Sequence, residues 1–281
     1  MAFFCGVYGY EITREFTVCG LRLVPRHTSF QDAQEAARDL NRYNLTATII
    51  ADELPQELLF RLEAVLSFVE HLDVLVTEPE LLTSSDQLTQ LPSVLLTAKR
   101  HNGGGAMICS DTLFRQSRPK FIEKAMMRLA DSAYCESTGY RTLFFKSTET
   151  FRLRRPFLEV SYFLLFSGLE TYVRRTLNDF QTREVAVVLN RRLAALGFNT
   201  CNFSSTAPER SMDSYARLRN ALFHNSNFEA RRSHRGSSLT YRLEQYISPF
   251  RILVDLVVLK ATDFDDGHIN WNAWLDRQLF K

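Results

Sequence analysis

The chain has 281 residues, of which 45% are hydrophobic and 23% are charged, and its formal net charge at pH 7 is +2. This composition excludes extended disorder, and the length predicts two domains, each large enough to bury a core. The charge is uneven: residues 151–281 carry 19 Lys and Arg against 13 Asp and Glu, whereas residues 1–150 carry 15 Lys and Arg against 19 Asp and Glu. A basic half is typical of proteins that bind a polyanion.

Residues 1–115 predict a small mixed α/β domain. β-branched and aromatic residues alternate with helical patterns there. Thr28 and Ser29 are placed to cap the first helix, and Pro55 opens the second. Val7–Ile12 and Glu15–Val24, with Gly20, are expected to form strands or a hairpin, and Leu45–Ala51 and Leu72–Thr77 are the other expected strands. The expected helices run to Asn41 and from Pro55 to Val69.

Residues 116–155 are expected to connect the two domains. Pro119–Ala133 has helical spacing, and Tyr140–Phe145 resembles a short strand or connector. Gly103–Gly105 is interpreted as a turn, because no Gly-Lys-Ser/Thr follows to make a phosphate loop. A basic run and Pro156 mark the start of the second domain.

Residues 156–281 predict a helical bundle. The long helix Phe157–Asn178 has Phe163, Phe166, Leu169, Tyr172 and Val173 at core spacing. The other expected elements are a helix at Arg183–Leu196 ended by Gly197, a loop to Ser211, a helix from Asp213, a polar loop at Asn225–Gly236, one or two helices within Leu239–Phe264 broken near Pro249, and a tail in which Trp271 and Trp274 pack back on the bundle.

The cysteines and the apolar runs bear on location. The five cysteines are scattered without a C-x-x-C spacing, which favours a reducing cytoplasm and predicts neither disulfides nor a zinc site. Met1–Gly20 lacks the pattern of a signal peptide, and the longest apolar runs fall short of a membrane span. We therefore expect a cytoplasmic protein that has no membrane partner.

The most chemically suggestive stretch is Asp213–Phe228, which holds Arg219, Asn220 and His224 on one short helix. RNA cleavage without a metal needs a group that moves protons and a cation for the charge that develops on the phosphorus. Histidine titrates near neutrality, and arginine forks onto two phosphate oxygens. On the opposing interpretation, His224 is a histidine favoured by the helix dipole and Arg219 is a surface charge.

The spacing of this stretch favours a shared site. Arg219 and His224 are five residues apart, about 140° around an ideal helix, whereas Asn220 and His224 share a face. One site on one straight helix is therefore difficult to form, unless the helix ends near Phe223 or two copies of the chain pair across the motif.

The surrounding charge is the best nucleic-acid signal in the chain. Seven arginines lie between Arg210 and Arg242 against only Asp213 and Glu229, which favours RNA binding or, on the simpler reading, a solvated face with salt bridges. The arginines that we predict to bind RNA are Arg217, Arg231, Arg232 and Arg235.

Arg219-Asn220-Ala221-Leu222-Phe223-His224 resembles the R-x(4–6)-H signature of HEPN domains, in the variant with Asn directly after Arg. The predicted order of helices over about residues 156–264 is similar to the HEPN bundle, and the resemblance does not reach residues 1–115. It implies a dimer with facing motifs that cuts RNA without metal or cofactor, leaving a 2′,3′-cyclic phosphate and a 5′-hydroxyl. Arg219 and His224 would be catalytic and Asn220 supporting, with Glu170 and Tyr215 as further candidates for support.

Many HEPN ribonucleases are bacterial toxins or phage-defence effectors restrained by a partner or a second domain. By analogy we expect a regulated effector in which residues 1–115 are a sensor or regulatory domain. One alternative is a catalytically inactive HEPN-like module for dimerisation or for binding RNA or a partner. Another makes the first domain a nucleotide or ligand sensor, with a polar cleft at the carboxyl ends of Leu45–Ala51 and Leu72–Thr77.

Overall fold

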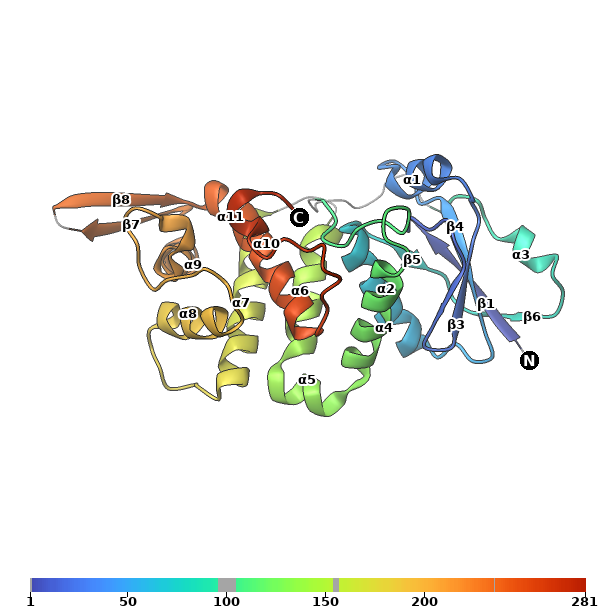
Figure 1. Cartoon of the computed structure of the whole chain (residues 1–281), viewed down its shortest axis with the longest axis horizontal. Coiled ribbons are helices and arrows are strands. Elements are labelled where there is room, and N and C mark those ends of the chain that lie inside the picture. Colours follow the sequence, from blue (N-terminus) through green and yellow to red (C-terminus); the bar gives the residue numbers. More distant parts are fainter. Residues whose placement is uncertain (1, 96–104, 154–156, 235) are drawn as a thin grey trace. The chain divides into compact units, whose positions relative to one another are not determined.

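The computed structural model describes residues 2–95, 105–153, 157–234 and 236–281. The chain forms two compact units, of which the first comprises Met1–Ala130 and Phe151–Arg155 and the second Asp131–Thr150 and Pro156–Lys281. The first unit is built on an antiparallel sheet and the second is mostly helical, which confirms the predicted fold class (Figure 1). The predicted boundary at Pro156 and most of the predicted glycine turn lie outside the described residues.

The sheet of the first unit is organised on β1 (Ala2–Tyr8). This strand pairs antiparallel with β4 (Leu45–Ala51) along its length, with β5 (Leu75–Val76) near its end and with β6 (Glu80–Leu82) near its start. The expectation of a strand at Val7–Ile12 was wrong, because Gly9 has a φ of +83° and the strand ends before it.

The predicted hairpin around Gly20 is confirmed. It joins β2 (Phe16–Val18) to β3 (Leu21–Pro25), and β3 pairs with β4. Cys19 and Gly20 both have positive φ, as a tight two-residue turn between twisted antiparallel strands requires.

Helices α1 to α4 complete the described part of the first unit. The hydroxyl of Ser29 accepts a hydrogen bond of 3.1 Å from the N–H of Asp32, which caps α1 (Phe30–Arg38) as predicted. α2 (Gln56–Glu70) begins after Pro55, and its buried C-terminal half packs with α4 (Ser117–Ala130). The short α3 is Gln87–Gln90.

Aromatic side chains hold the second unit together. Phe250 of α10 (Leu243–Ala261) lies 5.2 Å from the ring of Tyr162 and 5.8 Å from that of Phe166, both on α7 (Leu158–Leu177), measured between ring centroids. It also stacks at 5.0 Å on Tyr215 of α9 (Met212–Asn225). Close packing of these buried rings fixes the three helices against one another.

The remaining elements of the second unit are α5 (Ser132–Thr138), α6 (Tyr140–Arg152), whose last two residues belong to the first unit, α8 (Val185–Ala195), the 3₁₀ turn η1 (Pro208–Arg210), β7 (Glu229–His234), β8 (Ser237–Arg242) and α11 (Ala273–Asp276). The expected C-terminal packing is confirmed for Trp274, which is fully buried in α11 where this helix packs on α10. The described part of the predicted connector thus forms α4, α5 and α6, which are divided between the two units.

Three local expectations were wrong. Tyr140–Phe145 is the start of α6, because Tyr140, Leu143 and Phe144 supply a buried helical stripe. The expected polar loop after Asn225 is largely β7, which pairs with β8 in a hairpin that projects beyond α9 (Figure 1). Pro249 lies inside α10 without breaking it.

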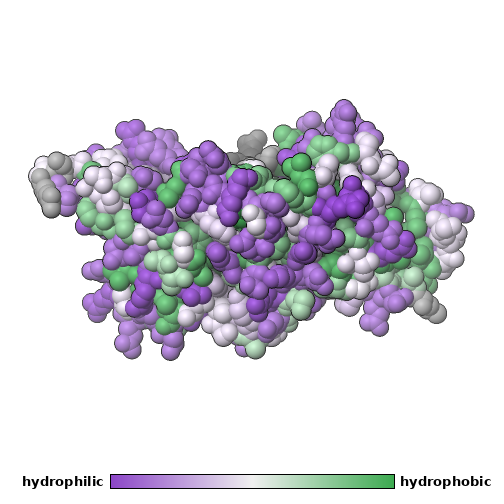
Figure 2. Space-filling model, viewed as in Figure 1, coloured by the Kyte–Doolittle hydropathy of each residue, from purple (hydrophilic) through white to green (hydrophobic). Residues whose placement is uncertain are grey.

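The apolar surface of the second unit also differs from one expectation. Phe163 is 46% exposed, because Tyr162 occupies the core position one residue earlier on α7. Hydrophilic residues predominate over the face of this unit drawn in Figure 2. No helix in the described part of the chain is long and apolar enough to cross a membrane.

Candidate functional site

The helix that carries the motif is α9. Met212, Tyr215, Leu218 and Leu222 are buried at helical spacing and hold one face of α9 in the core. The helix ends at Ser226, which has a left-handed φ of 49° and donates its backbone N–H to Leu222. The last turn therefore contains His224, while Arg219 lies in the middle of the helix.

Arg219 is held in place by a carboxylate and two aromatic rings. Its Nη2 lies 3.2 Å from Oε2 of Glu170 on α7, and its side chain is 27% exposed. The guanidinium carbon is 5.5 Å from the ring centroid of Phe166 and 5.7 Å from that of Phe223. A guanidinium supported in this way loses little side-chain entropy when it binds an anion.

Glu170 is the fixed point of this arrangement. Its other oxygen, Oε1, accepts a hydrogen bond of 2.8 Å from Nε of Arg174, one helical turn along α7. The carboxylate is thus shared by two arginines and is only 17% exposed. The structure therefore places Glu170 beside Arg219 of the motif.

Asn220 lies next to Arg219 and is exposed. Its Oδ1 accepts a hydrogen bond of 2.9 Å from Nη1 of Arg219, so the amide group is attached to the guanidinium that it follows in sequence. This contact orients the Asn220 amide with its N–H donors free for a ligand.

His224 is separate from this pair. It is exposed in the last turn of α9, and it does not line the pocket that Arg219 and Asn220 share. Within the described part of one chain, the motif is therefore divided between a pocket that contains the arginine and a solvent-facing histidine.

Tyr215 is a core residue in the structure. It is fully buried, its hydroxyl donates to the carbonyl of Glu209 at 2.8 Å, and its own carbonyl accepts from the hydroxyl of Tyr162 at 2.7 Å. Burial raises the pKa of the Tyr215 hydroxyl far above its ordinary value. Tyr215 supports the site by fixing α9 on α7.

The pocket beside Arg219 has a volume of about 560 Å³ and is rich in arginine. Arg183, Arg217, Arg219 and Arg232 line it, against the carboxylates of Glu184 and Asp213. Val185–Val187 at the N-terminus of α8 form another part of its wall, and Glu184, which precedes them, does not cap the helix with its side chain. Uncapped N–H groups and a surplus of arginine favour an anionic ligand.

The other arginines predicted to bind RNA are placed differently. Arg217 and Arg232 both form ion pairs with Asp213, the first at 2.8 Å. Arg232 also lies over the ring of Phe203, 3.6 Å from its centroid. Arg231 is exposed on β7 and does not line the pocket, and Arg235 lies outside the described residues.

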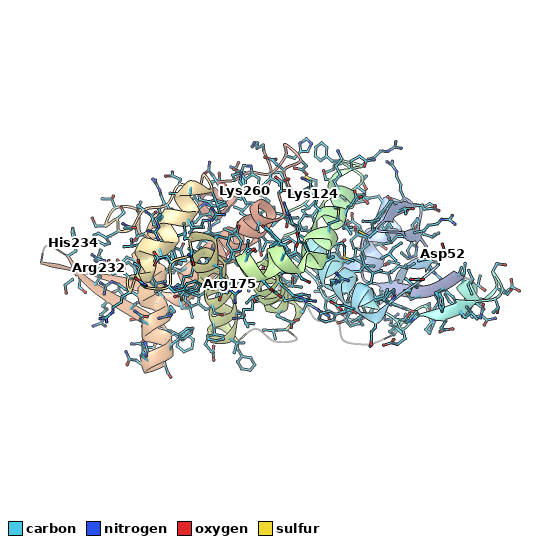
Figure 3. All side chains as sticks on the ribbon, turned by 90° about the horizontal axis from the view of Figure 1, so that it is seen from below. Asp52, Lys124, Arg175, Arg232, His234 and Lys260 are labelled. Atoms are coloured by element: carbon cyan, nitrogen blue, oxygen red, sulfur yellow. The ribbon has the colours of Figure 1, made fainter. Side chains whose placement is uncertain are left out.

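The hairpin brings Arg232 and His234 against Phe203, which lines the pocket. Alternation along β7 turns Arg232 toward Phe203 and leaves its neighbour Arg231 exposed. His234, two residues further along β7, also contacts Phe203, at 5.0 Å between ring centroids. Figure 3 labels Arg232 and His234 on the hairpin.

Sequence reasoning missed Arg183, Asp213 and Phe203 as site residues. Arg183 was assigned to a helix, but it precedes α8 and faces the pocket. Arginine directly before a helix start is a usable signal for an anion site, whereas the position of Phe203 in a loop carries no such signal.

A second, apolar groove of about 330 Å³ borders the last turn of α9. Phe163 and Phe223 form its centre, with ring centroids 5.1 Å apart, and Val160 and Phe228 extend it. These four side chains, which we call the apolar patch, are each between 38% and 46% exposed. The apolar patch therefore leaves a substantial hydrophobic surface next to His224.

Within the described residues, no group of three or more His, Cys, Asp and Glu side chains is arranged to hold a metal ion. Comparison with known proteins identified no matching family, no curated relative and no similar solved structure. The resemblance to HEPN domains stays a prediction that rests on the motif and the order of the helices.

Proposed function

We propose that the protein is an endoribonuclease that cleaves RNA by attack of the ribose 2′-hydroxyl, giving 2′,3′-cyclic phosphate and 5′-hydroxyl ends without a catalytic metal. The observation that carries the proposal is the supported Arg219–Asn220 pair in an arginine-rich pocket, with His224 on the same helix. Arg219 would stabilise the charge that develops on the phosphorus, and His224 would transfer protons.

The separation of Arg219 from His224 leads to a symmetric dimer. One copy supplies the pocket, and the histidine that completes the site comes from the other. The apolar patch gives this second copy a surface to cover, because it borders the turn that carries His224 and its burial is favourable. The patch and the motif would thus be buried together.

Single substitutions test the chemistry. Arg219→Ala and His224→Ala are each expected to slow cleavage of a single-stranded RNA in EDTA by at least 100-fold, the usual contribution of such groups. Arg242→Ala and His27→Ala are the matched controls, because Arg242 is paired with Glu229 away from the pocket and His27 belongs to the first unit. Cleavage that survives both motif substitutions would refute the proposal.

Mixing the two inactive variants tests the shared site. A dimer of one Arg219→Ala chain and one His224→Ala chain has one site with both wild-type residues if these come from different chains. Partial recovery of cleavage after mixing is expected, whereas no recovery would show that each chain uses its own pair.

The dimer itself is tested on the apolar patch. Val160→Asp with Phe163→Asp should convert the protein to a monomer in light scattering and abolish cleavage, since a buried charge is costly at such a surface and neither side chain supports Arg219. Phe180→Asp is the control, because Phe180 is 64% exposed in the same unit and lines neither pocket.

An inactive HEPN-like module that binds RNA or a partner is the alternative, and the arginine pocket also supports it. In that case the purified protein binds RNA and releases no cyclic-phosphate ends. We further propose a cytoplasmic toxin or antiviral effector that the first unit or a partner restrains. Induced expression in a bacterial host should then arrest growth only when Arg219 and His224 are intact.

A further inference from the structure

The first unit contains a buried cluster of charged residues. Nη1 of Arg118 lies 2.7 Å from Oε1 of Glu70 and donates to the carbonyl of Glu11 at 3.0 Å. The Glu11 carboxylate is 3.9 Å from the same nitrogen and accepts a hydrogen bond from Ser110. Arg118, Glu70 and Glu11 are at most 3% exposed, so their charges are almost fully removed from water.

Asp111 is the carboxylate of this cluster whose Oδ1 receives no hydrogen bond from the described residues. It is 5% exposed, and its Oδ1 is buried without a hydrogen bond from any described residue. Oε2 of Glu70 and the hydroxyl of Tyr10 are likewise buried and unpaired. A buried carboxylate oxygen without a hydrogen bond destabilises the folded chain, so hydrogen-bond donors from outside the chain would stabilise this cluster.

Asp111 faces a pocket of about 520 Å³, within the usual size range of small-molecule sites. Three exposed basic side chains, Arg14, Arg115 and Lys120, line the same pocket and outnumber the two exposed carboxylates of its rim, Glu15 and Glu123. Phe16 of β2 contributes a half-buried aromatic ring. The pocket thus combines a deep acceptor, a flat apolar surface and a basic rim.

We propose that this pocket binds a guanine nucleotide, with the Asp111 carboxylate accepting hydrogen bonds from the base and with Arg14, Arg115 and Lys120 holding the phosphates. An ionised carboxylate only accepts hydrogen bonds, so it selects a base edge that presents adjacent donors. Guanine presents its N1–H and N2–H₂ groups on one edge, whereas adenine presents an acceptor at N1. The basic rim matches the charge of the phosphates.

The pKa of Asp111 is consistent with a carboxylate that lacks a hydrogen-bond donor. Burial raises the pKa of Asp111 to about 7, although Arg118 and Arg14 lower it and Glu70 and Glu11 raise it further. Bound N–H donors would stabilise the ionised form, so nucleotide binding should release protons near pH 7. This site is separate from Arg219 and His224 and does not depend on ribonuclease activity.

The test is titration calorimetry of the full chain at pH 8, where the carboxylate is mostly ionised, with GMP, GTP, AMP, L-arginine and inorganic phosphate. Guanine nucleotides are expected to bind at least 10-fold more tightly than AMP, because a site built to accept from N–H groups discriminates against a base without them. L-Arginine tests a guanidinium ligand, and inorganic phosphate tests the basic rim alone. Tighter binding of either than of GMP would overturn the proposal.

Variants assign the binding to this pocket. Asp111→Asn should weaken GMP binding at least 10-fold and reduce the ratio of the affinity for GMP to that for AMP. Asp52→Asn, which replaces an exposed carboxylate of the same unit labelled in Figure 3, should change neither quantity. Arg115→Gln with Lys120→Gln replaces only exposed side chains, so folding should be preserved. This double variant should lose more affinity for GTP than for guanosine. Unchanged affinity in this double variant, or no GMP binding to the wild-type chain, would refute the proposed site.

Discussion

Replacing Asp255 with asparagine should change how the stability of the second unit depends on pH. Asp255 is fully buried on α10, where the hydroxyl of Ser147 donates to its Oδ1 at 2.6 Å. Burial raises the pKa of the carboxyl to about 7, against the lowering effects of Ser147 and Arg251. The amide that replaces this carboxyl would keep an acceptor for Ser147 and could not ionise.

The magnitude follows from the difference between the folded pKa, about 7, and the ordinary value of 3.8. Because the folded pKa is the higher one, the folded state binds the proton more tightly, and wild-type stability falls as pH rises from 3.8 to about 7. At about 1.4 kcal/mol per pH unit, the loss is roughly 2 kcal/mol between pH 5 and pH 7, and little more is lost above that. The Asp255→Asn variant should not show this loss of stability with rising pH.

The assay is urea unfolding between pH 5 and pH 8, followed by tryptophan fluorescence. The chain has two tryptophans, Trp271 and Trp274, and both belong to the second unit, so the signal reports the unit that contains Asp255. The difference in free energy of unfolding between Asp255→Asn and wild type should move in favour of the variant by about 2 kcal/mol from pH 5 to pH 7. Glu244→Gln, an exposed change on the same helix, is the control. A constant difference across this range would refute the reasoning, whatever its value at one pH.

Two further substitutions examine the supports of the site and of the fold. Glu170→Gln should slow RNA cleavage and should lower the stability of the second unit by about 1–2 kcal/mol, because it removes the anion shared by Arg174 and Arg219. Glu244→Gln, the exposed change on α10, is again the control, and unaltered kinetics would exclude a positioning role. Gly139→Ala should lower the free energy of unfolding more than Gly197→Ala does in the same assay. Both glycines have positive φ, but an added Cβ at Gly139 would lie 3.0 Å from Cδ of Arg175, whereas at Gly197 it would meet open space, so equal losses would contradict the steric argument.

The elements that local patterns determine were predictable from the sequence. The β-branched run Leu45–Ala51 is strand β4, and the capping residue Ser29 precedes α1 as expected. The apolar periodicity of the long helix matches α7 to within one residue at each end. In each case the residues near in sequence supply the cap, the buried face or the end of the element.

The hairpin could not be predicted in this way. β7 reads EARRSH, a polar sequence whose strand form depends on pairing with β8. Pairing partners and face exposure are tertiary properties, which override weak local preference. The same limit explains why the start of α6, Tyr140–Phe145, was interpreted as a short strand or connector.

The candidate site was predictable only in part. The sequence indicated Arg219, Asn220 and Glu170 as site residues, and the structure brings these three together. The walls of the pocket come from α8, a loop and the hairpin, which are distant in sequence, so Arg183 and Phe203 were not singled out from local patterns. The unpaired state of Asp111 likewise depends on what the fold places around it.

The ion pair between Arg219 and Glu170 has a consequence for selectivity among anions. Any anion that approaches Arg219 competes with a carboxylate already in place, which discourages small, singly bound ions such as free phosphate. A polymer that contacts Arg183 and Arg232 at the same time makes its next contact intramolecular, so its effective concentration at Arg219 is high. The Glu170 carboxylate thus favours multivalent polyanions, which can displace it from Arg219, over single small anions, which cannot.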